Sequence, residues 1–216
     1  MATKYSKCRI AVCFSFAVLF GGVTEAQVFR FDNVAYSAGV MSVAVGDVNQ
    51  VENDYFTATK DRRVKQLLYN VERNHLNKGV LEKIASGNYK FALADINFAM
   101  RYFPNHPTGL HLITTVAALT KNQTLPIPYF EKAIAFYPSH AITHAQYGWF
   151  FVTIGDLENG LQKLKHAVEM DPKLTAGYVW LAQAYEKKGD FELAHQAKER
   201  AKELGYKGKL PGDPGR

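Results

Sequence analysis

The sequence contains little cysteine and no long hydrophobic run after its first 20 residues. Two cysteines, Cys8 and Cys13, occur among 216 residues. They are too few for a disulfide scaffold, an iron–sulfur cluster or an all-cysteine zinc site. A glycine-rich phosphate loop, a nucleophile elbow, a haem-attachment pair and a zincin motif are also missing from the sequence. We therefore predict a protein that is not an enzyme, with no catalytic residue, no cofactor and no small-molecule substrate.

A strong excess of charge of one sign is missing as well. The chain has 26 Lys+Arg and 20 Asp+Glu, a net charge of +6. Without residues 1–26 the balance falls to +4, because three basic residues and one acidic residue are lost. Basic and acidic side chains alternate over residues 186–203, which is typical of a solvated helix face. A stripe of one sign would be needed to follow a phosphate backbone, so we predict no nucleic-acid partner.

The first 26 residues have the features of a secretory signal peptide. Three basic residues precede an apolar run over residues 10–20, and small residues follow before a polar chain begins. We predict cleavage after Ala26, which would remove both cysteines and leave Gln27 first. A periplasmic or secreted location follows from this prediction. The alternative is a chain tethered by an uncleaved amino-terminal anchor, although the apolar run is shorter than the ~20 residues of a membrane span.

A repeat of 34 residues organises the rest of the chain. Three columns of identical residues share this spacing, and they are Pro104, Pro138 and Pro172; Ala99, Ala133, Ala167 and Ala201; and Gly155 and Gly189, with Gly87 two periods before Gly155. Each period places apolar residues on one helical face, then a break at glycine, then a second amphipathic stretch. Asp156 and Asp190 follow the break glycines, and we predict that they cap the second helices.

These features resemble the tetratricopeptide repeat family, most specifically over residues 141–206, where two stretches match its pattern nearly column for column. Residues 107–140 match in the second half only, since Lys121 stands where glycine is expected and Pro126 where alanine is expected. We therefore predict a remodelled turn at residues 122–128. Residues 73–106 match apart from a short first helix. The predicted units are 73–106, 107–140, 141–174 and 175–206.

The resemblance implies an all-α fold, namely a right-handed α-solenoid of about four helix–turn–helix repeats. An irregular amino-terminal extension, residues 27–72, precedes it. Within the extension we predict a helix at 61–72, capped by Asp61, whose apolar stripe would cover the end of the array. Glycine and proline in residues 207–216 predict a flexible tail.

In such an array the first helix of each pair lines a concave face that binds partners. The family register predicts that the groove is lined by His111, Thr115, Ala145, Trp149, Val152, Val179, Gln183 and Lys187. Trp149, near the middle, would serve as an aromatic contact for a peptide or helix. The alternative is that Trp149 packs against the amino-terminal segment. Some family members hold a terminal carboxylate with Lys and Asn residues, but the equivalent positions here are occupied by His111, Thr115, Ala145, Trp149 and Val179.

Three hypotheses for function follow. The first is an exported scaffold that binds another protein in the groove, as an accessory or assembly factor of a periplasmic or envelope complex, with membrane proximity through that complex. The second is a permanent structural subunit of a larger membrane-associated complex, docked through residues 27–60. The third and weakest is a metal carrier that uses His140 and His144, which are four residues apart.

Overall fold

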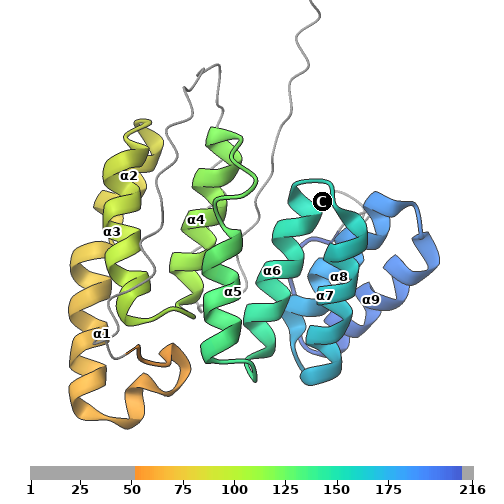
Figure 1. The fold of residues 1–216 in the computed structure, drawn as a ribbon. Helices are drawn as coiled ribbons and strands as arrows, with labels where there is room; N and C mark the ends of the chain where they lie inside the picture. The colour runs from red at the N-terminus through yellow and green to blue at the C-terminus, as the bar shows by residue number, and fades with distance from the viewer. Residues whose placement is uncertain (1–51, 211–216) are drawn as a thin grey trace, which may run out of the picture. The chain divides into compact units, whose positions relative to one another are not determined.

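The structure, a computed structural model, describes residues 52–210, and the predicted signal segment lies outside these residues. The described residues form helices and turns, with no strand among them, which confirms the predicted all-α class (Figure 1). In chain order the elements are the 3-10 helix η1 (Tyr55–Lys60) and the α-helices α1 (Arg62–His75), α2 (Lys78–Ala85), α3 (Tyr89–Tyr102), α4 (Pro107–Thr120), α5 (Ile127–Phe136), α6 (Ala141–Thr153), α7 (Leu157–Met170), α8 (Thr175–Lys188) and α9 (Phe191–Glu203).

Four helix pairs follow one another along the 34-residue period: α2 with α3, α4 with α5, α6 with α7, and α8 with α9 (Figure 1). Before them lies α1, which Asp61 caps by accepting hydrogen bonds from the Arg63 and Val64 amides. This helix runs to His75, three residues beyond its predicted end. It stops there because Asn77 caps α2, accepting from the Gly79 amide while its side chain donates to the Arg73 carbonyl.

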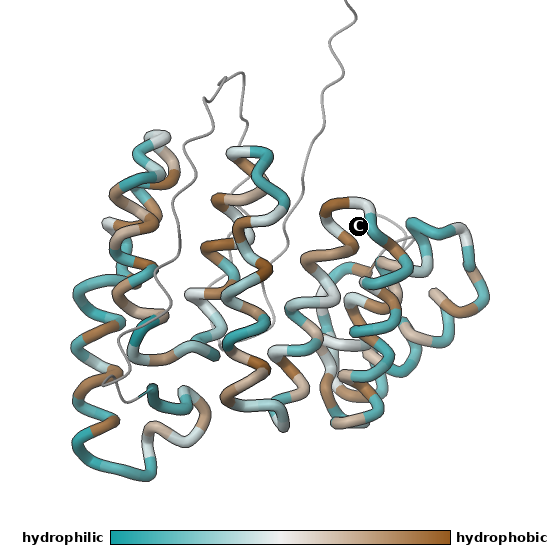
Figure 2. The backbone as a smooth tube through the Cα atoms, in the orientation of Figure 1, coloured by the Kyte–Doolittle hydropathy of each residue, from teal (hydrophilic) through white to brown (hydrophobic). Residues whose placement is uncertain are grey.

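The amphipathic helices bury their apolar stripes between pairs. Along α1 hydrophobic and hydrophilic residues alternate with the helical period, as Figure 2 shows. Leu68 and Val71 of α1 pack with Ala99 and Phe103 around α3. The helix therefore covers the apolar side of the first pair, which the terminal unit of a repeat array requires.

A left-handed backbone position ends the first helix of each pair or opens the turn after it. Gly87, Gly155 and Gly189 have φ angles of 77°, 91° and 89°. Lys121 occupies the same column and also has a positive φ, 56°. The left-handed position is therefore kept in the second pair although the glycine is missing. A residue with a Cβ is strained in this conformation by about 1–2 kcal/mol.

The third pair crosses at two glycines. A Cβ at Gly148 would lie 2.9 Å from the Gly160 carbonyl oxygen, and a Cβ at Gly160 would lie 2.6 Å from a methyl group of Val152. The two backbones therefore touch without a side chain between them. One period later Ala182 and Ala194 hold these positions, and α8 and α9 also approach closely.

The second pair has a wider arrangement. Thr114 and Pro126 stand at its crossing positions, one period before the two glycines. The proline lies at the N-cap of α5, which begins at Ile127 after a turn over residues 121–126. The backbones of α4 and α5 hardly approach each other. Large side chains, among them Ile113 and Phe130, fill the space between them as part of the core.

The structure differs from the sequence-based expectations at the start of α9 and in the tail. Asp190 precedes α9 but its side chain caps no amide, because it pairs with Lys188 at 2.8 Å. Asp156 does cap α7, accepting from the Asn159 amide.

The predicted flexible tail is wrong for its first residues, since Leu210 is buried against Val179 and Ala201. The apolar side of the last pair is thus covered by this side chain.

The strained turn yields a stability prediction. Replacing Lys121 by glycine should raise the free energy of unfolding by about 1 kcal/mol, because glycine adopts positive φ without the Cβ penalty. The mirror substitution, Gly155→Ala, should lower it by a similar amount. Urea denaturation followed by circular dichroism measures both. A lower stability for K121G, as expected for glycine in an ordinary turn, would contradict the interpretation.

The glycine crossing yields a second prediction. Gly148→Leu should cost about 3 kcal/mol of stability, because overpacking forces the α6 and α7 backbones apart. The matched control is Ala135→Leu on the exposed side of α5, which should change stability by less than about 0.5 kcal/mol. Equal midpoints of thermal unfolding for the two variants would exclude a close crossing.

Candidate functional site

Two tryptophans from neighbouring pairs form the most distinctive side-chain arrangement on the predicted groove helices. Trp149 of α6 and Trp180 of α8 stack with ring centroids 6.2 Å apart and planes inclined by 12°. Both side chains are half-buried and pack against the core of the last two pairs. They are the only two tryptophans of the chain. We call Trp149, Trp180 and Lys187 the tryptophan site.

Lys187 adds a cation to this site. Its Nζ lies 5.5 Å from the centroid of the Trp149 ring and donates a hydrogen bond to the Val152 carbonyl oxygen at 3.5 Å. The residues on either side of it in α8 both form ion pairs: Glu186 pairs with Lys198, and Lys188 pairs with Asp190. No carboxylate of the described residues forms an ion pair with Lys187. Burial of this ammonium lowers the pKa of Lys187.

Three of the eight predicted groove residues have almost no exposed surface. Ala145 and Val152 belong to the core between α6, α7 and α8. Val179 lies against Leu210 and Ala201. The family register assigns these positions to the groove face, but close helix packing and the folded-back tail cover them. They are packing residues in this structure and offer no surface to a partner.

Of the five remaining groove residues, Trp149 lies on α6 and the others lie on α4 and α8. On α4, Thr115 donates a hydrogen bond from Oγ1 to the carbonyl oxygen of His111. Burial lowers the pKa of His111 to about 4, so its imidazole is neutral at pH 7. Gln183 of α8 is half-buried. The structure therefore brings Trp149 and Lys187 together, whereas His111 and Thr115 form a separate part of the face.

Trp180 was not among the predicted site residues. In this unit the family register selected Val179, Gln183 and Lys187, so it gave no reason to select Trp180. Trp180 belongs to the tryptophan site because it contacts α6 of the preceding pair. The spacing of residues within one helix does not reveal such a contact. The one available signal was that the sequence has a single other tryptophan, in the adjacent unit.

The proposed histidine pair does not form a metal site. His140 Nε2 faces Asp54 Oδ1 at 2.9 Å, whereas His144 Nε2 lies 2.9 Å from the Pro138 carbonyl oxygen. A carbonyl only accepts, so His144 holds its proton on this nitrogen and cannot use it as a metal ligand. The two imidazoles thus bind different groups. Within residues 52–210 no three His, Cys, Asp or Glu side chains are grouped to hold a metal ion.

Residues 52–60, which we call the strap, pack on the repeats of the same chain. The strap contains η1 and its N-cap, Asp54. Ala58 is buried in the core formed with α1 and α3. Backbone and side-chain groups of the strap bind the connections at residues 102–106 and 137–140. This part of the predicted docking segment 27–60 is therefore occupied within the chain, and residues 27–51 lie outside the described range.

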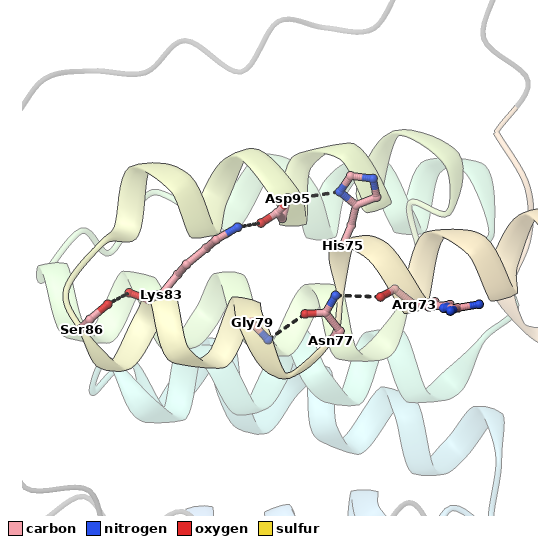
Figure 3. Close-up of polar contacts among 7 residues, drawn as sticks. All are labelled: Arg73, His75, Asn77, Gly79, Lys83, Ser86 and Asp95. Atoms are coloured by element: carbon pink, nitrogen blue, oxygen red, sulfur yellow. Dashed lines mark hydrogen bonds and ion pairs between the residues drawn. The ribbon is translucent and has the colours of Figure 1, made fainter.

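A cluster of polar side chains joins α1, α2 and α3 (Figure 3). The Asp95 carboxylate on α3 lies between His75, at the end of α1, and Lys83 of α2. Burial alone would raise the pKa of Asp95, but hydrogen bonds from Lys83 and His75 outweigh it and lower the pKa. Each side chain already has its partner. The cluster therefore links α1, α2 and α3 at their junction.

None of the helices between residues 52 and 210 is both long enough and apolar enough to cross a membrane.

The comparisons with known proteins give one family match and a set of similar solved structures. The family model of the tetratricopeptide repeat matches residues 176–204. Among solved structures, MamA (residues 41 to the end) from Desulfovibrio magneticus RS-1 is 22% identical, with a TM-score of 0.44 over 66% of this chain and 84% of that chain. YrrB, described as a TPR protein with an unusual peptide-binding site, is 16% identical, with a TM-score of 0.44 over 69% of this chain and 82% of that chain.

The comparison with curated proteins found no match. The match of the family model covers most of α8 and α9. The last helix pair is therefore similar in sequence to a tetratricopeptide repeat.

Proposed function

We propose that this protein is an exported scaffold that binds a segment of another protein at the tryptophan site. The main support for this proposal is the stacked pair Trp149–Trp180 with the Lys187 ammonium beside it. Tryptophan is enriched among the residues that dominate binding energy at interfaces, because a large rigid ring buries much area at low entropic cost. A peptide or helix is the class of ligand that a repeat face accommodates.

The charge at the site supports a partner with an apolar or aromatic side chain near an acceptor group. An ammonium with reduced hydration and no paired carboxylate gains from an added acceptor, which would restore part of its lost solvation. The apolar face of the tryptophan pair would bury the adjoining side chain. We place the scaffold in an envelope complex because the leader sequence predicts export.

Binding at this site can be measured directly, because its two tryptophans are the only ones in the chain. Partners are first captured from the cell-envelope fraction with the mature chain and identified. Titration of a tryptophan-free peptide from the partner should then change the intrinsic fluorescence. Trp149→Ala should weaken binding about thirtyfold, since the loss of an aromatic contact at an interface costs about 2 kcal/mol. Lys187→Met should weaken it less, by about tenfold or less.

The matched control is Phe191→Ala, which removes an aromatic side chain that is 72% exposed at the start of α9. This variant should bind as the unchanged chain does. Trp180→Phe keeps an aromatic ring and separates loss of contact from loss of folding. A partner that binds W149A and the unchanged chain equally well, with no change in fluorescence, would disprove the tryptophan site.

The export part of the proposal has its own test. Intact-mass measurement of the chain purified from its native source should give a protein that begins at Gln27. A mass that includes residues 1–26 would instead favour the tethered form, in which the apolar segment stays in the membrane. Separation of periplasmic from membrane fractions distinguishes the two forms independently.

A further inference from the structure

The described part of the chain begins next to the helix that carries Trp149. The Glu52 carboxylate pairs with Lys132 at 2.8 Å, and the Glu52 carbonyl oxygen accepts a hydrogen bond from the Tyr137 hydroxyl at 3.0 Å. Tyr137 ends α5, and α6 begins at Ala141. The chain that precedes residue 52 is therefore attached at the connection between α5 and α6.

The tryptophan site lies within reach of this attachment point. Because an α-helix rises ~1.5 Å per residue, Trp149 is ~12 Å along α6 from Ala141. The Val152 carbonyl oxygen, which Lys187 binds, is ~17 Å along the same axis. An extended chain covers ~3.3 Å per residue, so residues 47–51 span up to ~17 Å and residues 38–51 up to ~46 Å. The length of chain before the strap is thus sufficient.

Residues 38–51 combine apolar side chains with a single carboxylate. They lie outside the described residues, and Asp47 is the only charged residue among them. Their larger apolar side chains are those of Val40, Met41, Val43, Val45, Val48 and Val51. Such side chains gain free energy when they leave water for an apolar surface. This stretch of sequence therefore favours a site that offers both apolar area and a cation.

The tryptophan site offers both. The rings of Trp149 and Trp180 are half-buried and leave part of their surface accessible. The Lys187 ammonium lies beside the Trp149 ring, and no carboxylate of residues 52–210 forms an ion pair with it. A carboxylate added here would make a charge-assisted hydrogen bond. The charge and the apolar area of the site thus complement those of residues 38–51.

We propose that residues 38–51 of this chain occupy the tryptophan site when no partner is bound. In this state the Asp47 carboxylate faces Lys187, and the valines that flank Asp47 cover the tryptophan rings. The inference rests on the tryptophan site of the proposed function, but the contact itself needs no partner. A partner must displace the segment, so its apparent affinity falls in proportion to the fraction of molecules with an open site. Residues 38–51 are therefore an intramolecular inhibitor of binding.

Cysteine cross-linking in the full mature chain tests the contact without a partner. The predicted mature chain has no cysteine of its own, because Cys8 and Cys13 belong to the signal segment. A chain with Val48→Cys and Gln183→Cys should form an internal disulfide under mild oxidation, since Gln183 lies between Trp180 and Lys187 on α8. In the matched control, Val48→Cys is combined with Lys188→Cys.

The control differs from the test pair mainly in direction. Residue 188 is in the last turn of α8, but its side chain pairs with Asp190 rather than facing Trp149. Its disulfide should form at least about tenfold more slowly, because only docked residues have a high effective concentration near Gln183. Adding Asp47→Asn to the test pair should slow cross-linking by about fivefold, the effect expected of one lost ion pair.

Binding of the partner provides the second measurement. Val45→Asp places a charge on the apolar part of the segment and should release it from the rings. The partner peptide should then bind about tenfold more tightly, as expected if the site is closed in about nine of ten molecules. Leu81→Asp places the same charge on a side chain of α2 that is 53% exposed, and it should leave the affinity unchanged.

Each result either supports or overturns the proposal. Equal cross-linking rates for the two cysteine pairs, or a rate that D47N does not change, overturn the contact. Disulfides that form only between two chains would place the segment on a second copy and overturn it as well. Selective cross-linking with unchanged affinity in V45D would overturn the inhibitory role. Selective cross-linking in a chain that binds no partner would refute the proposed function and still support the contact.

Discussion

The arrangement of this protein depends on how closely two helices of a pair can approach at their crossing. Gly148 and Gly160 allow backbone contact between α6 and α7, and Ala182 and Ala194 do nearly the same for the next pair. Close packing brings the second tryptophan-bearing helix within reach of the first, because α6 and α8 then lie side by side. The stack of Trp149 on Trp180 follows from this geometry. A small volume change at the crossing would alter both the core and the candidate site.

Where the small residues are missing, other interactions take over. In the pair α4–α5, large side chains such as Phe130 fill the space between the two helices. Lys121 adopts the strained left-handed backbone conformation at the end of α4. The strap then links the two ends of the unit through Asp54. The burial of Asn105 beneath it makes the link part of the folded structure. The irregular unit is thus stabilised by groups from outside its own helices.

This division of the array fits the proposed scaffold function. The regular pairs hold Trp149, Trp180 and Lys187 in fixed positions, which lowers the entropic cost of binding a partner. The connections on either side of the irregular pair are instead held by contacts between histidines and carboxylates of the extension. The binding surface and these contacts rest on different residues and can be separated by substitution.

The sequence by itself determined the period, the helix pairs and the capping role of Asp61, because these depend on local spacing and local hydrogen bonds. It also located the irregular turn, from Lys121 and Pro126. Only the tertiary structure decided which groove positions stay exposed: it buried Val152 in the core and Val179 under Leu210. It also paired Trp149 with Trp180 and bound the strap to connections about 50 and 85 residues away. Such contacts join residues whose separation no helical period encodes, so their physical origin is long-range packing.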